Sequence, residues 1–130
     1  MNHQLFVLFT KDVEPCTRQT GTSGPVSDEA GMRSIQDFEG VLSRAGYRAT
    51  YFVHPELIET DPEFYRTLRK NGCALGLHLH TSKYSAAPKP WELGGFEGPE
   101  QRRLLELAAD QFEKGLGSRP TIFRPGCFSA

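Results

Sequence analysis

Two histidines, His78 and His80, stand one residue apart near the end of a short apolar run in the stretch GCALGLHLHTSKY. In a β-strand alternate side chains point to the same side, so these two imidazoles would project together, with Leu79 turned the other way. Such a pair is a common part of a zinc site. Taken alone the pair is a weak signal, because histidines at the surface of strand ends are ordinary.

A carboxylate pair and an arginine add to this signal. Asp12 and Glu14 follow the first apolar run, and Arg124 lies in the last one, TIFRPG. Two imidazoles and one carboxylate are a frequent ligand set for a catalytic divalent ion, and a second carboxylate can then act as general base. A guanidinium can fix that base in its ionised form or balance charge that develops on a substrate. The competing interpretation is a solvated turn at Asp12 and Glu14 and an exposed, unrelated arginine.

The elements that would position these side chains follow from the hydrophobic periodicity. The sequence predicts strands over residues 4–10, 47–53, 73–80 and 121–126, and helices over 28–45, 61–70 and 99–117. Strands that alternate with helices indicate an α/β fold with a parallel sheet. In such a fold the carboxyl ends of the strands lie along one edge, so the carboxylates, imidazoles and guanidinium are expected on one rim.

Composition narrows the class of protein. The chain has 130 residues, 38% of them hydrophobic, and a formal net charge of -1. These values predict a single domain over residues 1–130, with no nucleic-acid partner and no membrane span. The apolar stretch from Leu5 to Phe9 is too short for a signal peptide, and the three cysteines show no CxxC spacing. Both features favour a cytoplasmic location.

Two more residues are candidates for the rim. His54 follows the second predicted strand, but the proline after it suggests a turn, so we expect it to cap the rim rather than to bind metal. Trp91 lies in a long Pro/Gly-rich loop, 81–98. Its ring either stacks on a sugar as a substrate-binding residue or pins the loop to the body of the protein.

The stretches LFTKDVEP, RATYFVHPELIETDPEFYRTLRKNGCALGLHLHT and TIFRPG together resemble the polysaccharide deacetylase domain, the NodB-like carbohydrate esterase family 4. In that family a distorted (β/α) barrel holds a metal ion and removes N-acetyl groups from amino sugars. The resemblance implies that residues 1–130 form the N-terminal part of such a barrel. It also implies that Asp12 is the catalytic base, His78 the first metal histidine and Arg124 the arginine that orients the base.

The sequence departs from the family at two metal positions. Val13 replaces the aspartate that normally binds the metal, and Glu14 follows it. Ser82 stands where the second metal histidine belongs, so that His80, two residues nearer, is the obvious substitute. The resemblance therefore implies one divalent ion, most simply Zn²⁺, with ligands drawn from Asp12, Glu14, His78 and His80. Glu14 is favoured as ligand and Asp12 as base, although both could bind.

The family's later motifs, including the strand that supplies the general acid, have no counterpart before Ala130. We therefore expect a missing C-terminal segment, or a second chain, to complete the fold. The resemblance implies a hydrolase that removes N-acetyl groups from a sugar in a polysaccharide or its precursor, in biosynthesis of surface polysaccharide of the O-antigen type.

Other classes remain to be weighed. The altered metal positions and the missing acid also fit an inactive, carbohydrate- or metal-binding module. A flavodoxin-like receiver domain would need an acidic cluster and a late lysine, whereas the last strand here ends in Arg-Pro. Amidohydrolase barrels carry their HxH pair on the first strand, not the third.

Overall fold

A computed structural model describes residues 4–16 and 24–129 of the chain. Four parallel strands form one sheet in the order β1 (Phe9–Val13), β2 (Ala49–Val53), β3 (Ala74–Leu79) and β4 (Phe123–Pro125). Each strand pairs with the one before it in the chain, as consecutive strands do in a (β/α) barrel. A flavodoxin-like domain instead holds its first strand inside the sheet, so this order argues against a receiver domain.

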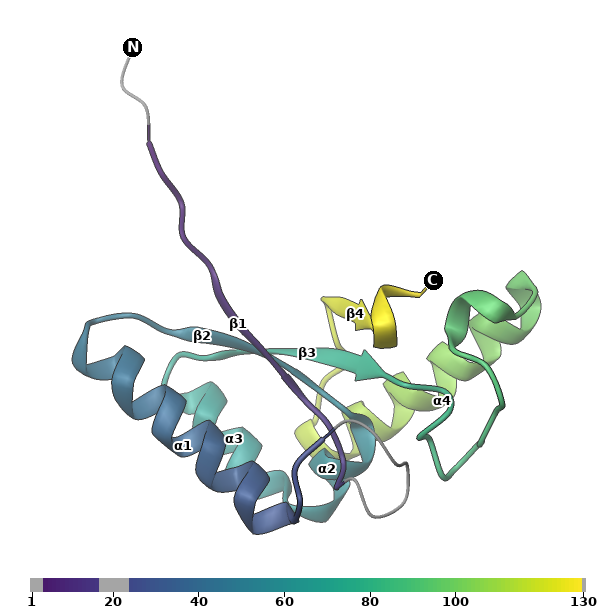
Figure 1. Ribbon diagram of the computed structural model, residues 1–130, viewed down its shortest axis with the longest axis horizontal. Coiled ribbons are helices and arrows are strands. Elements are labelled where there is room, and N and C mark those ends of the chain that lie inside the picture. The colour runs from purple at the N-terminus through teal and green to yellow at the C-terminus, as the bar shows by residue number, and fades with distance from the viewer. Residues whose placement is uncertain (1–3, 17–23, 130) are drawn as a thin grey trace.

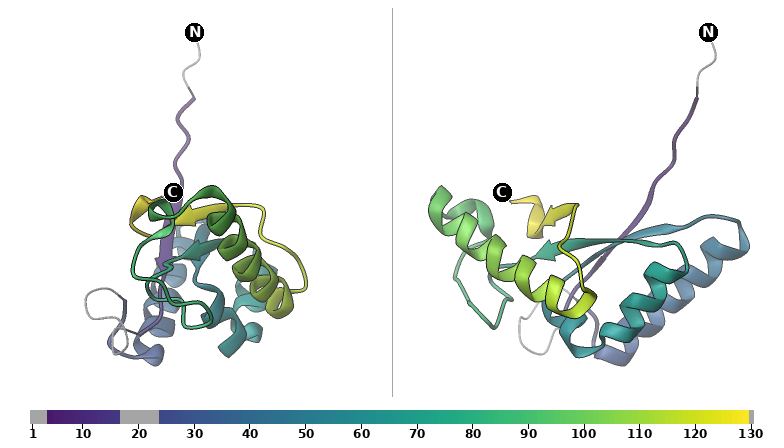
Figure 2. Two further views of the ribbon diagram at one scale, coloured as in Figure 1. Left: turned by 90° about the vertical axis from the view of Figure 1, so that its right-hand side faces the viewer. Right: turned by 180° about the vertical axis from the view of Figure 1, so that it is seen from behind.

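The sheet curls into half of a barrel, with helices against its outer face (Figures 1 and 2). The helices are α1 (Asp28–Arg44), α2 (Pro55–Thr60), α3 (Pro62–Lys70) and α4 (Gly98–Leu116). Two short 3₁₀ turns, Leu93–Gly95 and Gly126–Phe128, precede α4 and follow β4. No helix within the described residues is long and apolar enough to cross a bilayer. The four parallel strands and the helices between them confirm the predicted α/β architecture with a parallel sheet.

The helix ends follow from local side chains. The Ser27 hydroxyl accepts a hydrogen bond from the Ala30 amide at 3.2 Å and begins α1. The Asp61 carboxylate does the same for the Phe64 amide at 3.1 Å, directly before the proline that opens α3. Gly117, with a φ of 75°, ends α4 in the left-handed conformation that glycine adopts without strain. The predicted start of α3 at Asp61-Pro62 is confirmed.

The core lies between the sheet and the helices. Every residue of β2 is buried, which fits a strand with a neighbour on each side. The predicted apolar face of α4 contributes Leu104, Ala108, Phe112 and Leu116, all buried. Gly115 on the same helix lets α4 approach α2 closely, because a Cβ there would lie 2.5 Å from Cγ2 of Ile58.

Two predictions about the elements are wrong. The first strand was expected over residues 4–10, but β1 is Phe9–Val13, and Leu5, Phe6, Val7 and Leu8 are 64–87% exposed. The pairing of β1 with β2 begins at Phe9 and Ala49, and residues 4–8 lead away from the body without strand pairing (Figure 1). The turn expected after His54 is the short helix α2, which Pro55 opens at a position where proline is favoured.

Several large apolar side chains of the long loop and of the segment around β4 are exposed. They include Trp91 at 65%, Ile122 at 39%, Phe123 at 37% and Phe128 at 80%. With β4 as an edge of the described sheet, these side chains and the unpaired edge form a surface that further strands could cover.

Two glycines inside helices should respond oppositely to alanine. Gly115→Ala should lower the free energy of unfolding by about 1–3 kcal/mol, because the new methyl group would overlap Ile58. Gly40→Ala in α1 should raise it by about 0.5–1 kcal/mol, because its Cβ would meet nothing nearer than the flexible Arg44 guanidinium at 3.5 Å. Urea denaturation measures both. Equal effects of the two substitutions would contradict the close contact of α4 with α2.

Candidate metal centre

Three potential ligands meet at the carboxyl ends of β1 and β3. Glu14 directly follows β1, His78 lies in β3, and His80 directly follows β3. The Glu14 Oε1 atom is 3.8 Å from Nε2 of His78 and 3.4 Å from Nε2 of His80, and the three ligand atoms lie within 4.8 Å of one another. Both imidazoles are almost fully buried. The structure thus brings together three of the four residues expected to bind metal.

Hydrogen bonds on the far side of each ring fix how the imidazoles are presented. His78 Nδ1 lies 2.9 Å from the backbone carbonyl oxygen of Arg124, and His80 Nδ1 lies 3.1 Å from Oε1 of Glu92. Oxygens of these kinds accept hydrogen bonds, so each Nδ1 is the donor. In a neutral ring each Nε2 then carries its lone pair on the side of Glu14. Histidines that bind metals usually have such an outer hydrogen bond to a carbonyl or carboxylate.

The three residues fit a divalent cation. The Nε2 atom of His78 is buried and has no hydrogen-bond partner in the described part of the chain, which is costly unless a ligand satisfies it. Burial lowers the pKa of His80, but Glu14 and Glu92 raise it by more, so the net shift is upward. Two imidazole nitrogens and one carboxylate oxygen match the donor preference of Zn²⁺ and leave a fourth position open.

Asp12 and Arg124 form a second group beside this centre. Arg124 Nη1 donates to Oδ1 of Asp12 at 2.5 Å, and Nη2 donates to the Thr10 hydroxyl at 3.1 Å. The guanidinium also stacks 4.0 Å above the Phe52 ring. Because His78 is the register partner of Arg124, this group lies next to the histidine pair. Asp12 itself belongs to neither cluster of potential metal ligands among the described residues, so its role as a ligand stays a prediction.

Sequence reasoning missed Lys83 and Glu92. The Lys83 ammonium forms an ion pair with Oε2 of Glu14, although lysines are seldom buried. Glu92 reaches back from the long loop to His80 and also accepts from the Ser82 hydroxyl at 2.5 Å. No spacing pattern could have identified Glu92. Lys83 stands only three residues after His80, and this nearness in the sequence was a possible signal. In the structure the Lys83 amide donates to the His80 carbonyl at 3.1 Å.

A second cluster of potential ligands shares His80 and consists of His80, Glu92 and Cys127. Glu92 already accepts hydrogen bonds from His80 and Ser82 there, so the geometry gives it the role of orienting His80. Cys127 is exposed and has a φ of 51°, which is unusual for a residue other than glycine.

Of the two remaining candidates, His54 is buried and Trp91 is exposed. His54 is fully buried, its ring meets Tyr84 edge-on at 5.8 Å, and neither ring nitrogen has a hydrogen-bond partner within the described residues. Burial lowers the pKa of His54 to about 3, so the ring is neutral. Trp91 is 65% exposed, and its backbone carbonyl accepts a hydrogen bond from the Thr81 hydroxyl. The loop is thus pinned through its backbone, and a substrate contact of the Trp91 ring stays a prediction.

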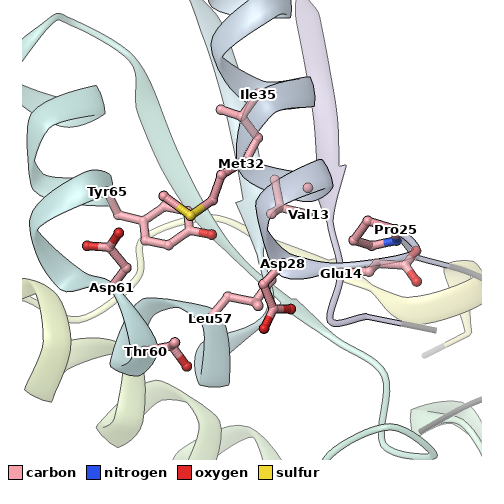
Figure 3. Close-up of a pocket in the computed structure, with 11 residues that line it drawn as sticks. Val13, Glu14, Pro25, Asp28, Met32, Ile35, Leu57, Thr60, Asp61 and Tyr65 are labelled. Atoms are coloured by element: carbon pink, nitrogen blue, oxygen red, sulfur yellow. The ribbon is translucent and has the colours of Figure 1, made fainter. Parts of the chain in front are cut away.

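A small cavity lies on the helix-covered side of β1 and is shown in Figure 3. Its volume is about 40 Å³, and Val13, Met32, Ile35 and Tyr65 are among the side chains that line it. Little more than a water molecule fits into such a volume. The cavity is therefore a packing gap beneath the rim and too small to hold a sugar.

Gly126 determines how closely the turn after β4 approaches His80. A Cβ at this position would lie 2.6 Å from Cγ and 2.8 Å from Cε1 of the His80 ring. Gly126→Ala should therefore push the ring out of place and weaken Zn²⁺ binding about tenfold or more, measured by calorimetric titration. Gly98→Ala is the control, because a Cβ there would meet nothing within 4 Å. Unchanged Zn²⁺ affinity of Gly126→Ala would show that metal binding does not depend on the position of the His80 ring.

His54 should make the stability of the metal-free protein depend on pH. Its pKa is lowered in the folded state, so the unfolded chain binds more protons between the ordinary value, 6.5, and about 3. The stabilisation is complete above pH 6.5 and decreases as the pH falls, by up to about 1.4 kcal/mol for each pH unit. Urea unfolding between pH 7 and pH 4 should show a shallower loss in His54→Leu than in the wild type. Parallel curves would mean that His54 can be protonated in the folded protein.

Comparisons with known proteins agree with this geometry. The chain matches the polysaccharide deacetylase family over residues 27–128. That range includes His78, His80 and Arg124 but not Asp12 or Glu14, whose assignment rests on the sequence and the structure. No match was found among curated proteins.

Several solved structures share the fold. The peptidoglycan deacetylase PdaC from Bacillus subtilis has a TM-score of 0.63 at 22% identity, covering 95% of this chain and 50% of its own. A structure described as T48 deacetylase with substrate has a TM-score of 0.62 at 17% identity, with the same coverage. The Bc1960 peptidoglycan N-acetylglucosamine deacetylase has a TM-score of 0.62 at 18% identity, covering 95% of this chain and 47% of its own.

The chain thus spans about half the length of these structures. A half-barrel with the expected strand order agrees with the family match, which extends over most of the chain. On this evidence the chain belongs to the polysaccharide deacetylase family.

Proposed function

We propose that residues 1–130 form the N-terminal half of a metal-dependent hydrolase that removes N-acetyl groups from an amino sugar. One observation carries the proposal. Two buried imidazoles, each held by an outer hydrogen bond at Nδ1, direct Nε2 toward the same carboxylate oxygen of Glu14. The buried Nε2 atom of His78 has no hydrogen-bond partner among the described residues, and His78 lies on the strand where the family carries its metal histidines.

Glu14, His78 and His80 would hold the ion, and Zn²⁺ suits the donor set best. When bound, such an ion supplies Lewis acidity that activates water and polarises the carbonyl of the N-acetyl group. In this chain the two histidines, His78 and His80, stand closer together than the metal histidines of the family, and Glu14 takes the place of the family's metal-binding aspartate. These departures change which residues bind but keep two imidazoles and one carboxylate.

Asp12 would act as the general base. Its Oδ1 is held by Arg124, so Oδ2 is the oxygen that we assign to take the proton from the attacking water. Arg124 donates to this carboxylate, and its guanidinium is itself positioned by the Thr10 hydroxyl and the Phe52 and Phe128 rings. The general acid that protonates the leaving amine would come from outside residues 1–130, on a missing C-terminal segment or a second chain.

The substrate would be an N-acetylated sugar in a polysaccharide or its precursor. Two of the similar solved structures are peptidoglycan deacetylases, which supports a glycan substrate. Trp91 lies in the long loop directly before Glu92, which contacts His80. The exposed Trp91 ring would therefore stack on a sugar near the centre. We place the activity in surface-polysaccharide biosynthesis of the O-antigen type, in the cytoplasm.

A second candidate is a module that binds a carbohydrate or a metal ion without catalysis. The specific observation in its favour is the ion pair between Lys83 and Glu14, which engages one oxygen of a candidate ligand carboxylate. In this case the rim would still bind a divalent ion or a sugar, but no acetate would be released.

Substitutions at the rim separate binding from chemistry. In the protein that contains this segment, the double variant His78→Ala/His80→Ala should lose bound Zn²⁺, measured by metal analysis after dialysis. Asp12→Asn should keep the ion but release acetate from N-acetylglucosamine oligomers about 10²–10⁴-fold more slowly, because only the base is removed.

Three results would count against parts of the proposal. Stoichiometric zinc in the double variant would refute the metal centre. Full activity of Asp12→Asn would refute the base. A wild type that binds zinc but releases no acetate from any N-acetylated glycan would favour the non-catalytic module.

A further inference from the structure

Lys83 is a buried lysine at the candidate metal centre. Its side chain is 6% exposed, and its ammonium forms an ion pair with Oε2 of Glu14. The turn after β3 brings it there, since the Lys83 amide donates to the His80 carbonyl at 3.1 Å. A lysine is rarely buried to this extent unless it pairs with an acid, and taking it out of water is costly. Its position therefore needs an explanation beyond packing.

The two oxygens of Glu14 face different partners. Oε1 lies 3.8 Å and 3.4 Å from the Nε2 atoms of His78 and His80, whereas Oε2 is held by Lys83. A carboxylate can bind a metal ion through one or both oxygens. With Oε2 held by the ammonium, Glu14 presents a single oxygen to the space between the imidazoles.

The ion pair also changes the charge of the centre. Glu14 carries one negative charge and Lys83 one positive charge, so the ion pair by itself has no net charge, and Glu92 on the far side of His80 adds one negative charge. Charges this well buried are poorly screened by solvent and salt, and they act on one another strongly. A divalent cation would therefore bind close to the Lys83 ammonium, whose positive charge repels it.

We propose that Lys83 is a built-in counter-cation that stabilises the metal-free centre and lowers its affinity for a divalent ion. The inference rests on the proposed metal centre and adds a control on how tightly that centre binds. Without an ion, the ammonium neutralises the partly buried Glu14 carboxylate. With an ion, the ammonium restricts Glu14 to one coordinating oxygen and repels the cation, which keeps binding reversible and a coordination position open.

Two other roles of Lys83 predict different results. If Lys83 only fills space, its removal would destabilise the protein and leave metal affinity unchanged. If it mainly positions Glu14 as a ligand, its removal would weaken metal binding. A counter-cation predicts that stability of the metal-free protein and affinity for the ion change in opposite directions.

The test compares Lys83→Met, which keeps the apolar stem and removes the charge, with Lys83→Arg, which keeps the charge. Lys114→Met is the matched control, because Lys114 pairs with Glu59 on the exposed surface. Zn²⁺ affinity is measured by calorimetric titration, and thermal unfolding is recorded with EDTA and with Zn²⁺. Lys83→Met should bind Zn²⁺ about tenfold more tightly than the wild type. It should also melt at a lower temperature in EDTA and show a larger upward shift on adding Zn²⁺.

Each outcome decides between the ideas. Lys83→Arg should resemble the wild type in affinity, and Lys114→Met should not change it. Unchanged or weaker Zn²⁺ binding in Lys83→Met would overturn the counter-cation role while leaving the metal centre in place. A wild type that binds no Zn²⁺, Co²⁺ or Mn²⁺ would overturn the metal centre and the inference together.

Discussion

The hydrogen bond between His78 Nδ1 and the backbone carbonyl of Arg124 is the interaction on which the rim depends. It joins β3 to β4 at the register position where the two residues are partners. It fixes the orientation of the His78 ring, and the same arginine reaches across with its side chain to Asp12 on β1. One residue of β4 therefore positions a candidate metal ligand through its backbone and a candidate base through its guanidinium. Loss of the β3–β4 pairing would disturb both at once.

Burying so many polar groups at one rim requires that each has a partner of opposite character. Glu14 lies among two imidazoles and an ammonium, Glu92 accepts from His80 and Ser82, and Arg124 pairs with Asp12 above an aromatic ring. Charged groups that are taken out of water are tolerated only when such pairing replaces their hydration. The exceptions in the described residues are informative. The buried side-chain atoms without a hydrogen bond there are Nε2 of His78, which lies on the side of Glu14, Oε2 of Glu92, and both ring nitrogens of His54, whose ring stays neutral.

Several apolar side chains and one sheet edge of the half-barrel are exposed, which is unfavourable in water. Residues 4–8 and the side chains of Trp91, Ile122 and Phe128 expose apolar surface, and β4 is a sheet edge. The chain spans about half the length of the similar solved structures, whose fold it shares. In the function that we propose, a missing C-terminal segment or a second chain would cover this apolar surface and supply the general acid.

The sequence by itself determined the alternation of four strands with helices, apart from the short helix α2, and the local geometry of the key pairs. Alternation placed His78 and His80 on one side of a strand, Asp61-Pro62 marked the start of α3, and the apolar period of α4 identified its buried face. Short-range patterns of this kind depend on a few neighbouring residues, so they are visible without the fold. The bounds of β1 could not be read from the sequence, because its pairing with β2 decides where the strand begins and ends.

Only the tertiary structure decided which side chains meet. Lys83 contacts Glu14 across 69 positions of the chain, Arg124 contacts Asp12 across 112, and Glu92 arrives from a loop without a periodic pattern. Separations of this size are set by strand register and by the path of a loop, which no local pattern encodes. For that reason the sequence identified candidate ligands and a base, whereas their charge balance and orientation emerged from the packed rim.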